Sequence, residues 1–177
     1  MKVDLNINDG FEWHQTRNVW AKGFLFDSNN NLYEKEKILD YFVDIKNKKT
    51  FEEKLNNANG FFSVVVKTSN CIFAAVDCVR SHPLFYNLKS QWLGDNPDNL
   101  SNTNRLQTNK IAHDEFKFTG YVTGKNTVYD DIMQIRAGEY ISINLSGDIE
   151  RSYYYQYIHK DFSLSPYDKA LQELDKK

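Results

Sequence analysis

Two nearly continuous apolar runs, joined by a short polar turn, dominate the middle of the chain. The runs cover residues 59–66 and 71–77, and the turn-forming residues 67–70 lie between them. Both runs are rich in β-branched and aromatic residues, which predicts a β-hairpin. Because the runs are continuous rather than alternating, we expect both faces of these strands to be covered. The hairpin is therefore predicted to lie in the middle of a layered domain.

The flanking segments predict mostly strands. Alternation predicts a strand at residues 2–7, and residues 11–17 and 19–26 are expected to form two strands or one long bent strand. Further strands are expected at residues 84–88, 91–93, 139–144 and 149–157.

Helical spacing of apolar residues is found in fewer places. It predicts a helix across residues 32–45, a shorter helical turn at 51–55, and a helix at 111–118 that ends at Gly120. The segment 94–104 is polar and is expected to be a loop, and residues 166–177 are expected to begin another helix.

Composition limits the classes of function that the chain can have. Its 177 residues, 41% hydrophobic and 15% aromatic, suffice for one domain with a substantial core. The formal net charge of −2 gives no electrostatic argument for binding nucleic acid or an anionic membrane. No apolar run has the length of a membrane span and the N-terminus lacks a signal-peptide core, so we expect a cytoplasmic protein.

An ordered set of short motifs resembles a known family. The set consists of Gly60-Phe61-Phe62, Asp77, Pro83-Leu84-Phe85-Tyr86, Thr127 and Gly138. It is similar to the N-terminal glutaminase-type domain of the asparagine synthetase family, a class II glutamine amidotransferase with the N-terminal-nucleophile (Ntn) hydrolase fold. The resemblance covers roughly residues 23–155.

The resemblance implies a fold and a domain boundary. The expected fold class is α+β, a four-layer αββα sandwich of two mainly antiparallel sheets. Residues 1–162 would form the amidotransferase-like domain. Residues 163–177 would begin a linker or helix towards a synthetase domain that is not present in this chain.

The resemblance also implies a nucleophile that this chain lacks. In the family, a cysteine follows the initiator methionine, and its thiolate attacks the glutamine amide with the free α-amine as base. Here the residue after Met1 is Lys2, and the earliest serine, threonine or cysteine is Thr16. Cys71 and Cys78 lie in or just after the central hairpin, where we expect buried structural thiols. No catalytic residue is therefore predicted.

The substrate-binding motifs have changed as well. The family's Asn-Gly-Glu oxyanion motif aligns with Lys22, Gly23 and Phe24, so only the glycine remains. Thr68 stands where the family has the aspartate that binds the substrate ammonium, and the Arg-Gly-Pro-Asp segment has no match. Losing one oxyanion donor costs about two to three decades in rate. We expect a remodelled pocket near Lys22, Gly23, Phe24 and Thr68 that does not hydrolyse glutamine.

The motif positions that remain are predicted to be structural, namely Gly60, Asp77, Pro83, Tyr86 and Gly138. Asp77, Arg80 and His82 could be misread as a catalytic trio. The preferred interpretation is that Asp77 ties its loop by accepting backbone N–H bonds. No histidine spacing typical of a metal site occurs, and neither a metal nor a cofactor is predicted.

Two functional hypotheses follow. The preferred one is a non-catalytic amidotransferase-like domain that serves as a scaffold or docking partner. Its partner would be an asparagine synthetase-like ATP-pyrophosphatase domain, in the same chain or in trans, and a homodimer is compatible with the sequence. The alternative is a small-molecule module in which the remodelled pocket binds an amino acid or carboxylate, with Lys22 as the point charge.

Overall fold

The fold is α+β, with two sheets packed face to face, as the sequence predicted. The computed structural model describes residues 1–101, 106–158 and 171–172. The expected helix at residues 166–177 and the expected boundary at 162/163 therefore lie almost wholly outside the described residues.

The larger sheet is built around the predicted hairpin. Its main path runs in the order β11 (Ile149–Tyr153), β10 (Glu139–Asn144), β6 (Cys71–Val76), β5 (Asn59–Lys67), β3 (Val19–Phe26) and β2 (Trp13–Gln15), and β4 (Leu32–Glu34) also pairs with β3. All of these pairings are antiparallel. The hairpin β5–β6 lies at the centre of this seven-stranded sheet, which confirms its predicted place.

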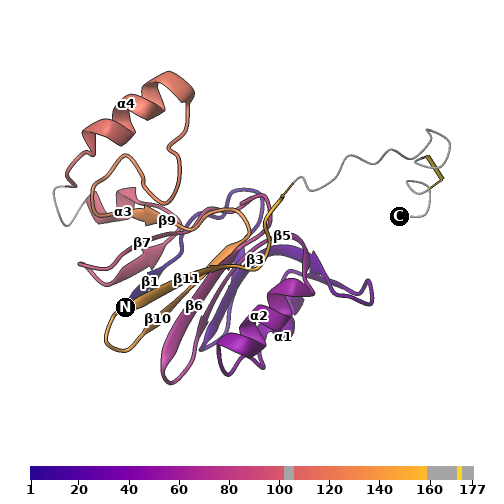
Figure 1. Cartoon of the computed structure of the whole chain (residues 1–177). Helices are drawn as coiled ribbons and strands as arrows, with labels where there is room; N and C mark the ends of the chain where they lie inside the picture. Colours follow the sequence, from indigo (N-terminus) through magenta and orange to yellow (C-terminus); the bar gives the residue numbers. More distant parts are fainter. Residues whose placement is uncertain (102–105, 159–170, 173–177) are drawn as a thin grey trace.

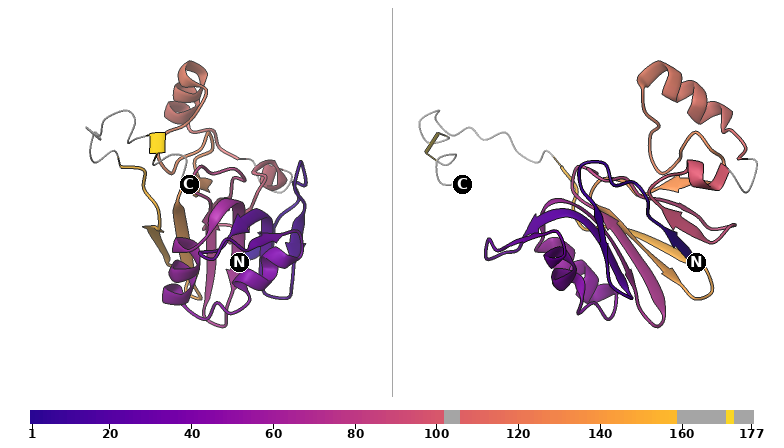
Figure 2. Two further views of the ribbon diagram at one scale, coloured as in Figure 1. Left: turned by 90° about the vertical axis from the view of Figure 1, so that its right-hand side faces the viewer. Right: turned by 180° about the vertical axis from the view of Figure 1, so that it is seen from behind.

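The smaller sheet covers part of the larger one. Its four strands follow the order β1 (Lys2–Asp4), β8 (Trp92–Gly94), β7 (Phe85–Asn87) and β9 (Met133–Gln134), and the β1–β8 pair is its parallel one. Figure 2 shows the two sheets as adjacent layers. Val65, Ala74 and Ile141 of the larger sheet pack between the layers against Tyr86 and Leu93 of the smaller one.

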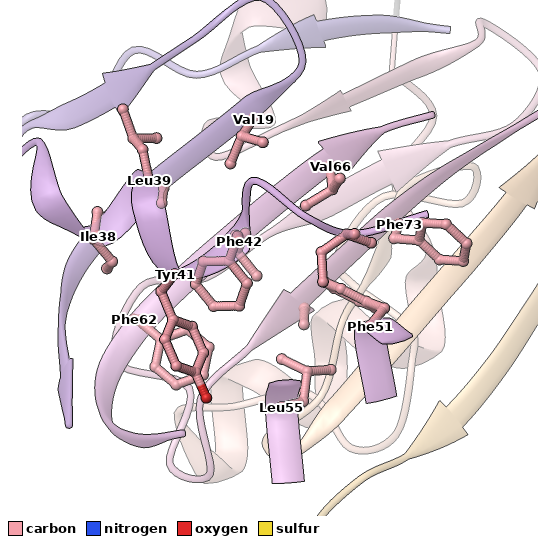
Figure 3. Close-up of a cluster of buried hydrophobic side chains, with 14 of the residues drawn as sticks. Val19, Ile38, Leu39, Tyr41, Phe42, Phe51, Leu55, Phe62, Val66 and Phe73 are labelled. Carbon is pink, nitrogen blue, oxygen red and sulfur yellow. The ribbon is translucent and has the colours of Figure 1, made fainter. Parts of the chain in front are cut away.

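Two helices cover the opposite face of the larger sheet. They are α1 (Lys37–Phe42) and α2 (Lys48–Asn56), and α2 begins at a capping box formed by Asn47 and Thr50. Phe42 and Phe51 point from these helices into a cluster that includes Phe62 and Phe73 of the sheet (Figure 3). Each fully buried phenylalanine contributes roughly 1.5–3 kcal/mol of hydrophobic free energy, so this layer is well anchored.

The fourth layer is thin. It consists of α3 (Asp98–Ser101), α4 (Lys110–Thr119) and the segment up to Ile132, which packs on Trp92 and Phe85 at the outer face of the smaller sheet. Helix α4 stands away from the two sheets (Figure 1), and Ala112 is its buried residue. The αββα order of the layers matches the prediction. No described helix has the length and apolarity needed to cross a membrane.

Several predicted elements need correction. Residues 32–34 form strand β4 rather than the start of a helix, because their backbone pairs with β3. Residues 98–101 form α3 in a segment expected to be a loop, and the final predicted strand ends at Tyr153 instead of residue 157. The strands at the N-terminus are also shorter than predicted, at residues 2–4 and 13–15.

Candidate functional site

The structure brings together three of the four residues predicted to line the remodelled pocket. Lys22, Gly23 and Phe24 are consecutive on β3 and pair in register with Ser63, Phe62 and Phe61 of β5. Thr68 follows the other end of β5, in the turn to β6. The predicted set is therefore divided between the middle of the β3–β5 pair and the turn beyond the end of β5.

Thr68 has a local role in its turn. Its hydroxyl accepts a hydrogen bond from the Cys71 backbone N–H and donates one to the Cys71 carbonyl, both at 3.0 Å. Met1 lines a small cavity beside Thr68, so the leading amine lies at this end of the sheet rather than near Lys22. Cys71 lines the same cavity as Met1; the Met1 side chain packs between the sheets, whereas Cys71 packs against the helix-facing core.

Lys22 is buried, and its charge is already compensated. Its Nζ donates a 2.6 Å hydrogen bond to the Ile7 carbonyl, and its side chain is nearly inaccessible. Burial lowers the pKa of Lys22, while the carboxylates of Asp95 and Asp9 oppose that shift. Asp95 itself is fixed by the indole N–H of Trp13 at 2.7 Å. The cation belongs to an internal polar cluster, which leaves little charge to attract a ligand.

Gly23 is retained for a backbone reason. Its φ is +99°, in the region that favours glycine, and a Cβ atom added there would lie 2.0 Å from the Phe61 carbonyl oxygen. The close approach of β3 and β5 therefore requires glycine at this position, whether or not its backbone N–H ever bound an oxyanion.

A group of phenylalanines, here called the phenylalanine cluster, surrounds Phe24 and is partly open to solvent. It consists of Phe11, Phe24, Phe26 and Phe61, from the loop before β2 and from strands β3 and β5. The ring of Phe24 lies 5.9 Å from Phe11, 6.2 Å from Phe26 and 5.6 Å from Phe61. Phe11, Phe26 and Phe61 are 40%, 36% and 48% exposed. The cluster occupies the inter-sheet face of β3 and β5 at an end that the smaller sheet leaves uncovered.

His82 borders this cluster on its inner side. Its ring packs edge-on to Phe11 at 5.4 Å. Burial lowers the pKa of His82, and the nearby Lys22 lowers it further, with Asp77 opposing. Its Nε2 is buried with no hydrogen-bond partner among the described residues. The hydroxyl of Ser63 donates to the His82 carbonyl rather than to the ring, so the two side chains do not form a nucleophile and base pair.

Asp77 is a loop-fixing residue, as predicted. Its side chain is fully buried and accepts backbone N–H bonds from Phe62, Val79 and Ser81 at 3.2, 2.8 and 2.9 Å. Its carbonyl also accepts the Gly138 N–H at 2.9 Å. These bonds connect the end of β6 to β5 and to the start of β10.

The two cysteines are half-buried free thiols rather than fully buried ones. Burial raises the pKa of Cys78, and the thiol is hydrogen-bonded to Tyr154. Neither thiol lies in the phenylalanine cluster. In the described part of the chain, no group of three or more metal-ligating side chains comes together.

The described polar groups at this site mostly bond within the protein, and Nε2 of His82 is the unpartnered exception. The cation is internally paired, the serine hydroxyl is bonded to a carbonyl, and aromatic rings occupy the surface. What it presents to solvent is an apolar face with a polar cluster beneath it. Such a face can bind another apolar surface.

Comparisons with known proteins give no family for this chain. No family model matches the sequence, and no curated protein matches it. The structure is similar to that of a glutamine phosphoribosylpyrophosphate amidotransferase from B. subtilis complexed with ADP and GMP, at 12% identity and a TM-score of 0.41, over 86% of this chain and 33% of that one. It is equally similar to an allosteric regulatory enzyme of purine biosynthesis, at 12% identity and a TM-score of 0.41, over 88% and 32%. The chain spans about a third of the length of these proteins.

Sequence reasoning identified Phe24 but not its neighbours. Phe11, Phe61 and His82 come from three other segments, and nothing local in the sequence links them to β3. The sequence did carry a weak signal. Apolar residues on both faces of a strand indicate that another surface covers each face. Phe24, Phe26 and Phe61 lie on the face that is only half covered.

Proposed function

We propose that this chain is a non-catalytic, amidotransferase-like domain that docks onto an ATP-dependent amide-forming domain of the asparagine synthetase type. The partner would be joined in the same chain or supplied in trans, in the cytoplasm. The motif resemblance to the family supports the proposal, and two of its positions, Asp77 and Gly138, connect the end of β6 to β5 and to the start of β10. The substituted positions Lys2, Lys22 and Phe24 carry no glutaminase chemistry.

The observation that carries the proposal is the exposed phenylalanine cluster at the end of the sheet pair. Buried aromatic anchors dominate the energetics of protein–protein interfaces. A partly exposed group of four packed rings, three of them on strands β3 and β5, fits a docking surface better than a catalytic pocket.

The first experiment tests the absence of glutaminase activity. The purified chain is incubated with glutamine and glutamate release is measured. We expect no turnover above background. Turnover that disappears on changing Lys2 or Gly23 would contradict the non-catalytic assignment.

The second experiment tests docking. A synthetase-type pyrophosphatase domain from the same genome is titrated with the chain by calorimetry. The double substitution Phe26→Ser and Phe61→Ser is expected to weaken binding at least tenfold, since interface aromatics contribute about 2 kcal/mol or more each. Phe118→Ser, on α4 and 89% exposed, is the matched control and should leave binding unchanged.

The outcomes of this titration separate the candidate partners. Equal binding by the double variant and the parent would rule out the phenylalanine cluster as the docking surface. Sedimentation of the chain alone tests whether a second copy of the chain binds this surface. Concentration-dependent dimers that the double variant abolishes would identify that second copy as the partner.

The geometry of Lys22 does not favour the alternative of a carboxylate bound in the remodelled pocket. Its Nζ already donates to the Ile7 carbonyl and faces two carboxylates. A thermal-shift screen with amino acids and carboxylates checks this alternative, since a ligand at a hundredfold its Kd stabilises by about 2.7 kcal/mol. A shift that depends on Lys22 would favour it over docking.

A further inference from the structure

A concave site lies at the outer face of the smaller sheet, away from the phenylalanine cluster. It is a cavity of about 680 Å³ between the outer face of the smaller sheet, the end of α4 and the loop that follows α4. This volume is in the range of small-molecule sites. Phe85 of β7 and Phe116 of α4 supply aromatic walls, and Tyr121 and Val122 supply the rim.

The charged groups of this cavity are all positive. Two arginines, Arg80 and Arg136, line it, and no aspartate or glutamate does. Arg136 is paired with the buried Glu139 at 3.2 Å. Arg80 has no ion-pair partner in the ranges that the structure describes. Its Nε donates to the Ile135 carbonyl at 3.0 Å, which leaves the two terminal nitrogens of the guanidinium for another acceptor.

The chain holds Arg80 in place by an unusual backbone conformation. Its φ is +62°, a left-handed value that favours glycine. Asp77 fixes the turn around it, since the Asp77 carboxylate accepts the N–H of Val79 and of Ser81 and the Asp77 carbonyl accepts that of Arg80 at 3.1 Å. Strained residues of this kind cluster at functional sites. Burial lowers the pKa of Arg80, which reflects a guanidinium with no anion beside it.

The wall formed by the loop after α4 is fixed before any ligand arrives. The Gln134 side-chain amide of β9 donates to the carbonyls of Val122, Gly124 and Asn126 at 3.0–3.1 Å. The Thr123 hydroxyl donates to Glu115 of α4 at 2.6 Å. A preformed wall lowers the entropic cost of binding.

We propose that this cavity binds a small organic monocarboxylate with an aromatic or branched aliphatic body, and that Arg80 binds the carboxylate. The free guanidinium nitrogens match a carboxylate in a bidentate geometry, and the phenylalanine and tyrosine walls match the apolar body. One unpaired arginine matches one negative charge, so a phosphate dianion would leave an uncompensated charge in a largely apolar cavity.

The test uses the intact chain and matched probes. Thermal unfolding and calorimetry are recorded with 3-phenylpropanoate and 4-methylpentanoate, and with the corresponding neutral amides. We expect the carboxylates to raise the Tm and the amides to have no effect. Arg80→Gly should weaken carboxylate binding by about tenfold or more, since charge-assisted bidentate hydrogen bonds are lost. This variant suits the test because glycine accepts the left-handed backbone at position 80, so the fold is expected to persist.

Two further variants sharpen the result. Arg17→Gln removes an exposed arginine charge outside the cavity and should leave binding unchanged. Phe116→Ser removes an apolar wall and should weaken binding while the preference for carboxylate over amide persists. Equal stabilisation by amides and carboxylates, unchanged binding by Arg80→Gly, or no shift with either carboxylate at about 10 mM, about ten-thousandfold above a micromolar Kd, would overturn the proposal.

Discussion

Gly23 and Arg80 both have left-handed backbone conformations, with φ values of +99° and +62°. At Arg80 the side chain is accommodated, because the turn is fixed by Asp77 and the guanidinium extends into a cavity. At Gly23 there is no room for a side chain, because the β5 backbone lies against the Cα atom. Position 23 therefore requires glycine for steric reasons. At position 80 a side chain fits, and the hydrogen bonds of the Asp77 loop maintain the left-handed backbone.

We predict that Gly23→Ala destabilises the chain by about 3 kcal/mol or more, which combines left-handed strain with overpacking against Phe61. Urea denaturation measures the free energy of unfolding. Gly10→Ala is the matched control, because Gly10 has a φ of +77° but nothing lies within 4 Å of the position that its Cβ atom would take. Its cost should be only about 1–2 kcal/mol. If Gly23→Ala proves no more destabilising than Gly10→Ala, the backbone explanation for this glycine is wrong.

Glu139 connects strands of both sheets. Its carboxylate, fully buried on β10, accepts hydrogen bonds from Arg151 of β11 at 2.6 and 2.8 Å and from Arg136 at 3.2 Å. Arg151 in turn donates to the hydroxyl of Tyr86 on β7 in the smaller sheet. Burial alone raises the pKa of Glu139, but the hydrogen bonds from the two arginines outweigh it and hold the pKa below its usual value.

The lowered pKa sets the direction of the pH dependence. Between the folded-state pKa and the usual value near 4.5, the unfolded chain binds more protons than the folded chain. The free energy of unfolding therefore rises with pH through this window, and this contribution is lost as the pH falls through the folded-state pKa.

We predict that Glu139→Gln lowers the free energy of unfolding at pH 7 by about 3–5 kcal/mol, because two partly buried arginines lose their carboxylate. The difference from the parent should shrink as the pH falls from 4.5 towards the folded-state pKa, below which the parent carboxyl is also neutral. Urea denaturation from pH 7 to pH 3 measures both effects. Glu150→Gln, on β11 and paired with Lys48 at the surface, should cost no more than about 1 kcal/mol. A constant difference across this pH range would contradict the assigned role.

At the scale of elements, the sequence predicted what local patterns determine. The apolar runs predicted β5 and β6, and helical spacing with a terminal glycine predicted α4, which ends at Gly120 with a φ of +79°. Strand β4 was missed because Leu32 and Tyr33 fit a helical rhythm as well as a strand. Its backbone partner on β3, a non-local contact, decides the conformation.

At the scale of the molecule, the sequence predicted the layers but only part of the sites. Lys22 and Phe24 were placed correctly on one strand by their motif, yet the burial of the Lys22 charge against Asp95 depends on a loop 73 residues away in sequence. Arg80 was interpreted only as part of the loop that Asp77 fixes. An arginine in the sequence does not indicate a left-handed backbone, so its conformation was not predicted. Folding brings these groups together from distant segments, so no spacing in the sequence identifies them.

Stability is expected to vary across the layers, and α2 and α4 offer a matched comparison. Both helices begin at an asparagine N-cap, Asn47 and Asn109. Helix α2 buries Phe51 and Leu55 against the larger sheet, whereas Ile111 and Phe118 of α4 are 83% and 89% exposed. The caps differ by the Thr50 half of the α2 capping box and by the left-handed Gly120 C-cap of α4. A cap contributes about 1 kcal/mol, so a larger difference in local stability between the helices reports tertiary packing.

We predict that backbone amides of α4 exchange with solvent at least a hundredfold faster than those of α2. Burying two large side chains contributes roughly 3 kcal/mol or more, and each 1.4 kcal/mol corresponds to a factor of ten in the opening equilibrium. Hydrogen exchange at pH 7, followed by mass spectrometry, measures both helices in one sample, with β5 as the slowest reference. Equal protection of α2 and α4 would show that α4 is packed against another surface in solution. A phenylpropanoate-dependent slowing confined to α4 and the loop that follows it would place the ligand beside Phe116.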